Sequence, residues 1–185
     1  MMASVRTATP VTGTRMTLDE WAALPGEDVR SELVDGLLVV TTAPSEPHQA
    51  AVGELFMLLR AACPPELRVR VGPLGVLVHD LTSGLMPDLL VLREDDRGGL
   101  DRLPVLVVEV LSPSTRGRDQ LDKRRLYQHR GIASYWLIDP EVPDLRVLEL
   151  GGSGEYVEVS YTAFVDVVEL HRPFAVRLSP ARLTG

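Results

Sequence analysis

The stretch Val105-Leu106-Val107-Val108-Glu109-Val110-Leu111 is apolar on both sides of a single acid. Its length and its many β-branched residues predict a buried strand in a sheet. An ionised carboxylate in such a strand costs several kcal/mol unless a cation compensates its charge. We therefore expect Glu109 to have a partner, either a metal ion or a basic side chain.

A second acid stands at the start of another apolar run. Pro87-Asp88 leads into Leu89-Leu90-Val91-Leu92, which predicts a neighbouring buried strand. Two carboxylates on adjacent buried strands suggest a divalent-metal site. The plainer interpretation of Asp88 is a turn residue after proline, a common place for aspartate.

The charged segment that follows, residues 116–129, predicts a helix ended by a glycine. Asp119, Lys123 and Tyr127 recur on it at steps of four and so share a face. We expect Lys123 on the packed face, where Glu109 would supply the anion that an inward lysine needs. The alternative is a solvated ion pair between Lys123 and Asp119.

Composition limits the classes of protein that this chain can represent. With 185 residues, 45% hydrophobic and 24% charged, it fits one soluble domain, expected over residues 16–185 after a disordered tail at 1–15. The net charge of −7 argues against broad non-specific attraction to nucleic acid. A lone cysteine, Cys63, excludes an internal disulfide and fits a cytoplasmic location. No apolar run is long enough to cross a membrane.

The remaining patterns alternate between helix and strand without a strict βαβ rhythm. Thr17 and Glu20 form a capping-box signature, and Asp35-Gly36 between apolar runs predicts a hairpin turn. The fold class is α/β or α+β, a mixed sheet flanked by helices. The other elements expected are helices over 17–24 and 45–62 and strands over 67–71, 75–78, 88–92, 134–138, 145–150, 155–160 and 174–176, with a final turn from Pro180.

Several motifs between Thr17 and Pro140 carry a resemblance to a known family. They are Glu32-Leu33-Val34-Asp35-Gly36, Pro44-Ser45 with His48-Gln49, Pro87-Asp88, Val108-Glu109-Val110-Leu111-Ser112-Pro113-Ser114, Asp119 with Lys123 and Tyr127, Gly131-Ile132, and Tyr135-Trp136-Leu137-Ile138-Asp139-Pro140. In these the chain resembles the Uma-type restriction endonucleases, members of the PD-(D/E)XK nuclease superfamily. That family's fold is a mixed sheet between helices, which agrees with the fold class inferred from the patterns.

The resemblance implies a metal-dependent nuclease. Asp88 and Glu109 would bind Mg²⁺ or Mn²⁺, with the backbone carbonyl of Val110 as a third ligand. The implied reaction is phosphodiester hydrolysis by a metal-activated water. One position departs from the superfamily pattern, which places Lys two residues after the Glu, where this chain has Leu111. Lys123 would then reach in from the helix to orient the water or bind the phosphate.

Further candidates extend the site, each beside a structural alternative. Glu32 is an additional acid at the site edge, or else an exposed hairpin charge. The arginines of the helix over 116–129 could instead form a charged helix surface. His48 could be a surface residue, and Tyr127 could be a core residue. The candidates for substrate contact are His48, Arg116, Arg118, Arg124 and Tyr127.

From the sequence we expect a DNA endonuclease that acts as a homodimer, since cutting both strands requires two sites. Two alternatives remain. One is a non-catalytic binding or assembly module that keeps the nuclease fold, which the acidic charge and the missing Glu-x-Lys favour. The other is a metal-dependent hydrolase of smaller phosphoesters. Neither a GxSxG motif nor a Gly-rich phosphate loop ending in Gly-Lys-Ser/Thr occurs in the chain, so covalent serine catalysis and P-loop chemistry are not expected.

Overall fold

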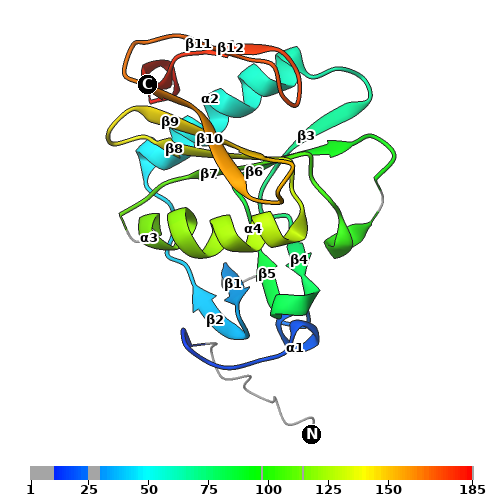
Figure 1. Cartoon of the computed structure of the whole chain (residues 1–185). Helices are drawn as coiled ribbons and strands as arrows, with labels where there is room; N and C mark the ends of the chain where they lie inside the picture. The colour runs from blue at the N-terminus through cyan, green and yellow to red at the C-terminus, as the bar shows by residue number, and fades with distance from the viewer. Residues whose placement is uncertain (1–10, 25–29, 97, 114, 185) are drawn as a thin grey trace, which may run out of the picture.

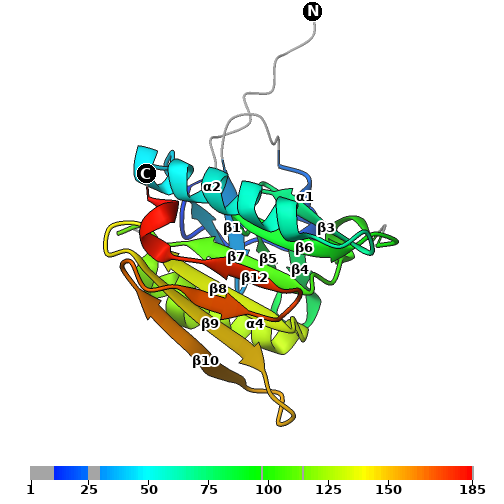
Figure 2. The same ribbon diagram turned by 90° about the horizontal axis from the view of Figure 1, so that it is seen from above.

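A computed structural model describes residues 11–24, 30–96, 98–113 and 115–184 (Figures 1 and 2). The chain forms one mixed α+β domain around a six-stranded sheet with strand order β10-β9-β8-β7-β6-β3. Its strands are β3 (Leu67–Val71), β6 (Leu89–Arg93), β7 (Leu106–Val110), β8 (Ser134–Asp139), β9 (Asp144–Leu150) and β10 (Tyr156–Ala163). Within it β7 and β8 run parallel, and the other neighbouring pairs are antiparallel. The predicted central strand is therefore β7.

Helices cover both faces of this sheet (Figures 1 and 2). Helix α2 (Glu46–Ala62) and the hairpin of β11 (Val168–Leu170) and β12 (Val176–Leu178) pack on one face, where Val108 and Val110 of β7 join their core. Helix α4 (Arg124–Arg130) packs on the other face, where Val107 lies. Burial from both sides explains why β7 is almost continuously apolar, and it places the Glu109 face under the helical segment, as predicted.

The helical segment before β8 is not one uniform α-helix. It begins with α3 (Arg116–Arg118), continues through a π-helical turn, η3 (Asp119–Lys123), and ends in α4. Gly131 terminates it in the left-handed conformation, with φ 79°, as predicted. The π turn is a correction to the simple helical prediction, and such turns occur often at functional sites.

A smaller four-stranded sheet lies beside the main one, with order β2-β1-β5-β4 (Figure 1). The predicted Asp-Gly hairpin joins β1 to β2, and α1 begins with the predicted capping box of Thr17 and Glu20. These elements are β1 (Ser31–Val34), β2 (Leu37–Val40), β4 (Val76–Val78), β5 (Ser83–Leu85) and α1 (Leu18–Ala22). The short helices η1 (His79–Leu81), η2 (Gly99–Asp101) and η4 (Pro180–Leu183) complete the fold.

Gly84 of β5 lies directly under the Trp21 ring. A Cβ atom at Gly84 would stand 2.7 Å or less from three carbons of that ring, which is 5% exposed. We expect Gly84→Ala to lower the free energy of unfolding by about 1 to 3 kcal/mol through overpacking. The matched control is Gly53→Ala in α2, where a Cβ meets nothing within 4 Å and should stabilise the helix by up to about 1 kcal/mol. Urea unfolding of both variants measures the two effects, and equal stabilities would contradict this packing.

Some of the structure was not predicted. The strands β5 and β11 contain three residues each, too few to show an alternating pattern. Strand β10 extends three residues beyond the predicted end, and β12 begins at Val176, where the predicted strand was to end. Residues 1–10 of the predicted tail lie outside the described residues, whereas Gly13 and Thr14 exchange backbone hydrogen bonds with Leu38 of β2. No helix in the described ranges is both long and apolar enough to span a bilayer.

Candidate active site

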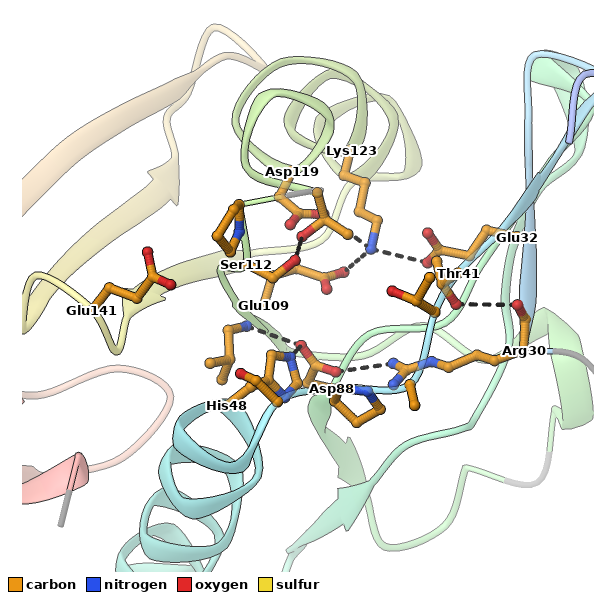
Figure 3. A pocket seen from close by; sticks show the side chains of 17 residues that line it. Arg30, Glu32, Thr41, His48, Asp88, Glu109, Ser112, Asp119, Lys123 and Glu141 are labelled. Atoms are coloured by element: carbon orange, nitrogen blue, oxygen red, sulfur yellow. Dashed lines mark hydrogen bonds and ion pairs between the residues drawn. The ribbon is translucent and has the colours of Figure 1, made fainter.

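A cavity of about 300 Å³ opens where the two sheets, the N-terminus of α2 and the π turn meet (Figure 3). Strand β1 contributes Glu32, the residue before β6 is Asp88, and β7 contributes Glu109. The charged and histidine side chains lining the cavity are Arg30, Glu32, His48, Asp88, Glu109, Asp119, Lys123 and Glu141. Segments far apart in sequence therefore bring several ionisable groups to one place.

Lys123 lies at the centre of three carboxylates. Its Nζ is 2.9 Å from Glu32, 3.0 Å from Glu109 and 3.2 Å from Asp119. The ammonium group has three protons, so each can serve one acid. Burial alone lowers a lysine pKa, but the attraction of these acids outweighs it and raises the pKa of Lys123 well above its ordinary value. Lys123 is the only lysine of the chain and stays charged at neutral pH.

Glu109 is fully enclosed between the strand and the helical segment. Its Oε1 accepts a 2.7 Å hydrogen bond from the Tyr127 hydroxyl and lies 3.0 Å from Lys123. Burial raises the pKa of Glu109 well above its ordinary value, and the charge of Lys123 only partly opposes this. Burial also raises the pKa of Asp119. Asp119 and Glu109 therefore hold their negative charge at a cost, which an added cation would relieve.

Asp88 is held by three donors of its own. Its Oδ1 is 2.9 Å from the Arg30 guanidinium, and its Oδ2 is 3.2 Å from His48 Nε2 and accepts the Val110 backbone N–H at 3.0 Å. Burial acts to raise the pKa of Asp88. The hydrogen bond and charge of His48, the Val110 N–H and the Arg30 charge outweigh this and lower the pKa to about 2.

The Asp88 pKa predicts how the metal-free protein responds to acid. The folded protein holds this carboxyl at about 2, below the unfolded value of 3.8. Ionised Asp88 therefore contributes about 2 kcal/mol of stability above pH 4, and this contribution is lost as the pH falls toward 2. Urea unfolding of wild type and Asp88→Asn between pH 2 and 7 in EDTA should show a stability gap that closes below pH 4. A gap independent of pH would contradict the assigned contacts.

The residues present fit a hard divalent cation by charge and by ligand type. Four buried carboxylates face two permanently charged cations, Arg30 and Lys123, which leaves an excess of negative charge. Carboxylate oxygens are the ligands that Mg²⁺ and Mn²⁺ prefer. No described donor reaches the second oxygen of Glu109. Among the described residues, no three acidic, histidine or cysteine side chains are already grouped as a metal cage, so the fit rests on charge and chemistry.

The structure brings together five of the candidate residues and separates the others. Glu32, His48, Asp88, Glu109 and Lys123 line the cavity, together with the Val110 backbone. His48 is 6% exposed, so the surface alternative for it is wrong. Glu32 is 2% exposed, so the exposed-hairpin alternative is wrong as well. Lys123 is 3% exposed, so its ion pair with Asp119 is buried and the solvated-pair alternative is wrong.

The proposed substrate-contacting residues of the helical segment do not line this cavity in the described part of the chain. Arg116 forms an ion pair with Asp139, and Arg124 donates to the Tyr156 carbonyl of β10. Tyr127 is a core residue whose hydroxyl supports Glu109 from behind. Arg118 likewise lies outside the lining residues. The charge cluster read from the sequence is thus distributed around the helix, because successive helical residues point in different directions.

Three charged cavity residues, Arg30, Asp119 and Glu141, were not among the predicted site residues. Asp119 was placed on one helix face with Lys123 but was given no role in the site, yet it is 1% exposed and lines the cavity. Arg30 stands two residues before Glu32, and the alternation of an extended chain places both on one face. That two-residue spacing was the signal that could have identified Arg30.

Comparison with known proteins identifies the family. A solved structure from Anabaena variabilis ATCC 29413, titled a "putative nuclease belonging to DUF820", matches 91% of this chain and 97% of its own, with TM-score 0.75 and 21% identity. That likeness shows the fold. None of the curated proteins matches. The model of the Uma2 family, described as "Putative restriction endonuclease", matches residues 18–183. The chain with this buried acidic cavity is therefore a member of the Uma2 family.

Proposed function

We propose that this protein is a metal-dependent endonuclease that hydrolyses phosphodiester bonds of DNA. The observation that carries the proposal is the excess of buried carboxylates over permanent cations around one open cavity. Such an arrangement is costly for the fold alone and useful for binding a divalent cation. The family description supports nucleic acid as the substrate.

In this proposal Asp88, Glu109 and the Val110 carbonyl hold Mg²⁺ or Mn²⁺. The ion, when bound, lowers the pKa of a water molecule and offsets charge on the scissile phosphate. Tyr127 fixes the Glu109 carboxylate through its 2.7 Å hydrogen bond. The Val110 N–H orients Asp88 in the same way. Both acids are thus positioned by partners behind them, which is the preorganisation that such catalysis requires.

Lys123 is the catalytic cation of the proposal. It neutralises Glu32, Glu109 and Asp119 from the helix, in place of the lysine that the superfamily carries two residues after its Glu. A lysine beside Glu109 can stabilise the negative charge that the attacking water gains as it loses its proton. Glu32 completes the site by fixing Lys123. Two copies of the chain would place two such sites on the two strands of a duplex.

Plasmid nicking tests this function directly. Supercoiled DNA is incubated with the protein in Mg²⁺, in Mn²⁺ and in EDTA, and open-circular product is measured. We expect cleavage in metal only, lost in Asp88→Asn. The matched control is Asp101→Asn, which alters an exposed Asp–His pair outside the cavity, His79 Nε2 lying 2.5 Å from Asp101. Wild-type protein that leaves DNA intact in both metals would contradict the proposal.

A second candidate is a binding module that keeps the nuclease fold. The observation in its favour is that Lys123 and Asp88 are already paired with other side chains of the site. Such a module would bind duplex DNA without cutting it and without a metal requirement. A hydrolase of smaller phosphoesters would instead cleave a chromogenic phosphodiester and leave the plasmid intact. The same protein preparation, assayed on both substrates, separates the three functions.

A further inference from the structure

Arg30 is the cavity cation with unused hydrogen-bonding capacity. Its Nη2 donates to Asp88 Oδ1 at 2.9 Å and to the Met86 carbonyl at 3.3 Å. No described residue accepts a hydrogen bond from its Nη1 or Nε, and its side chain is 33% exposed. The guanidinium lines the cavity beside Asp88 (Figure 3), with Nη1 and Nε unpaired among the described residues. Release of Nη2 from Asp88 would complete a planar fork, which matches the geometry of a phosphate.

Lys123 cannot serve the same purpose. Its three donors are all directed at carboxylates, and its side chain is 4% exposed. Binding a phosphate would require Lys123 to leave one of these buried acids without a cation, which costs several kcal/mol. Arg30 meets no such barrier, because its single acid, Asp88, keeps His48 and the Val110 N–H.

We infer that Arg30 changes partners during the reaction cycle: it neutralises Asp88 in the metal-free protein and binds a phosphate of the DNA substrate once a divalent cation occupies Asp88. This inference rests on the proposed function. Two cations beside one carboxylate repel each other, so Arg30 and the metal compete for Asp88. Arg30 is a substrate-binding residue in this account, and the arginine candidates of the helical segment are not.

The backbone around Arg30 is suited to this exchange. The Arg30 carbonyl accepts hydrogen bonds from both the Thr41 backbone N–H, at 2.9 Å, and the Thr41 hydroxyl, at 3.1 Å. The base of the side chain is thereby fixed to the loop that lines the cavity. Only the guanidinium end needs to move, from Asp88 toward the cavity opening.

Titration of Mn²⁺ by calorimetry gives the first readout, independent of cleavage. Arg30→Met removes the competing cation, so we expect Mn²⁺ to bind about tenfold more tightly than to wild type. Arg30→Lys keeps the charge and should bind Mn²⁺ like wild type. The matched control is Arg172→Met, which breaks an arginine–carboxylate pair of 3.0 Å with Glu149 outside the cavity and should change nothing.

Binding of a fluorescein-labelled DNA duplex gives the second readout. In Ca²⁺, with the DNA checked to be intact, Arg30→Met should weaken binding about tenfold and reduce the salt dependence by about one phosphate contact. In EDTA the same variant should differ little from wild type, because Arg30 then stays on Asp88. Arg30→Lys should fall between the two, since it lacks the bidentate fork.

The inference requires both effects. Weaker or unchanged Mn²⁺ binding in Arg30→Met, or DNA binding equal to wild type in Ca²⁺, would make Arg30 a fixed structural partner of Asp88 and overturn it. Wild-type protein that cleaves plasmid in the same preparation would leave the proposed function standing in that case. If wild type binds neither Mn²⁺ nor duplex DNA, the proposed function fails and this inference fails with it.

Discussion

Replacement of Lys123 by methionine is expected to destabilise the metal-free protein by about 3 to 5 kcal/mol. Methionine preserves most of the side-chain volume, so the effect comes from charge. The change leaves Glu32, Glu109 and Asp119 buried with no cation between them. A loss of this size is a large fraction of the stability of an ordinary domain.

Urea unfolding in EDTA, followed by circular dichroism, measures this loss. The deficit of Lys123→Met should shrink as the pH falls, because burial raises the pKa of Glu109 and of Asp119 and protonation then removes their charge. Adding Glu109→Gln to Lys123→Met should recover part of the stability. A deficit below about 1 kcal/mol at pH 7 would show that Lys123 does not neutralise these acids.

Glu109→Gln is expected to separate stability from activity. We expect at least a 10³-fold loss of DNA cleavage, which corresponds to about 4 kcal/mol of lost transition-state stabilisation. The same variant should be more stable than metal-free wild type by about 1 to 2 kcal/mol at pH 7. The reason is that the folded protein holds the pKa of Glu109 above the unfolded value, so its ionisation costs stability as the pH rises above 4.5.

The two halves of this prediction need separate measurements. Nicking rates in Mn²⁺ give the activity, and urea midpoints in EDTA from pH 4 to 8 give the stability. The advantage of Glu109→Gln should grow with pH, and it should disappear near pH 4. A variant that is both inactive and less stable would mean that Glu109 supports the fold, as a buried structural ion pair would.

Much of this site could be predicted from local pattern. Glu109 stands alone in an apolar run, which indicated that a cation lies beside it. The four-residue spacing of Asp119 and Lys123 placed both on the buried side of the helix. The Asp-Gly turn identified the β1–β2 hairpin of the small sheet, and the capping box identified the start of α1. In each case the deciding information lay within a few residues of sequence.

The rest depended on tertiary contacts. The arginines of the helical segment are close in sequence, but their side chains point in different directions. Arg116 pairs with Asp139, and Arg124 donates to a carbonyl of β10. His48 gave no local sign of burial, because its partner Asp88 is 40 residues away. Arg30 faces the cavity because it directly precedes β1, the strand that carries Glu32. Which cation meets which acid follows from how the sheets pack, and local pattern does not contain that information.

We expect the acids of this cavity to hold a divalent metal ion. Calorimetric titration of Mn²⁺ into wild type, Asp88→Asn, Glu109→Gln and the control Asp101→Asn tests it most directly. Wild type and Asp101→Asn should bind Mn²⁺ with equal affinity, and Asp88→Asn and Glu109→Gln should bind it at least tenfold more weakly. Absence of binding to wild type, or equal binding to all four proteins, would contradict it.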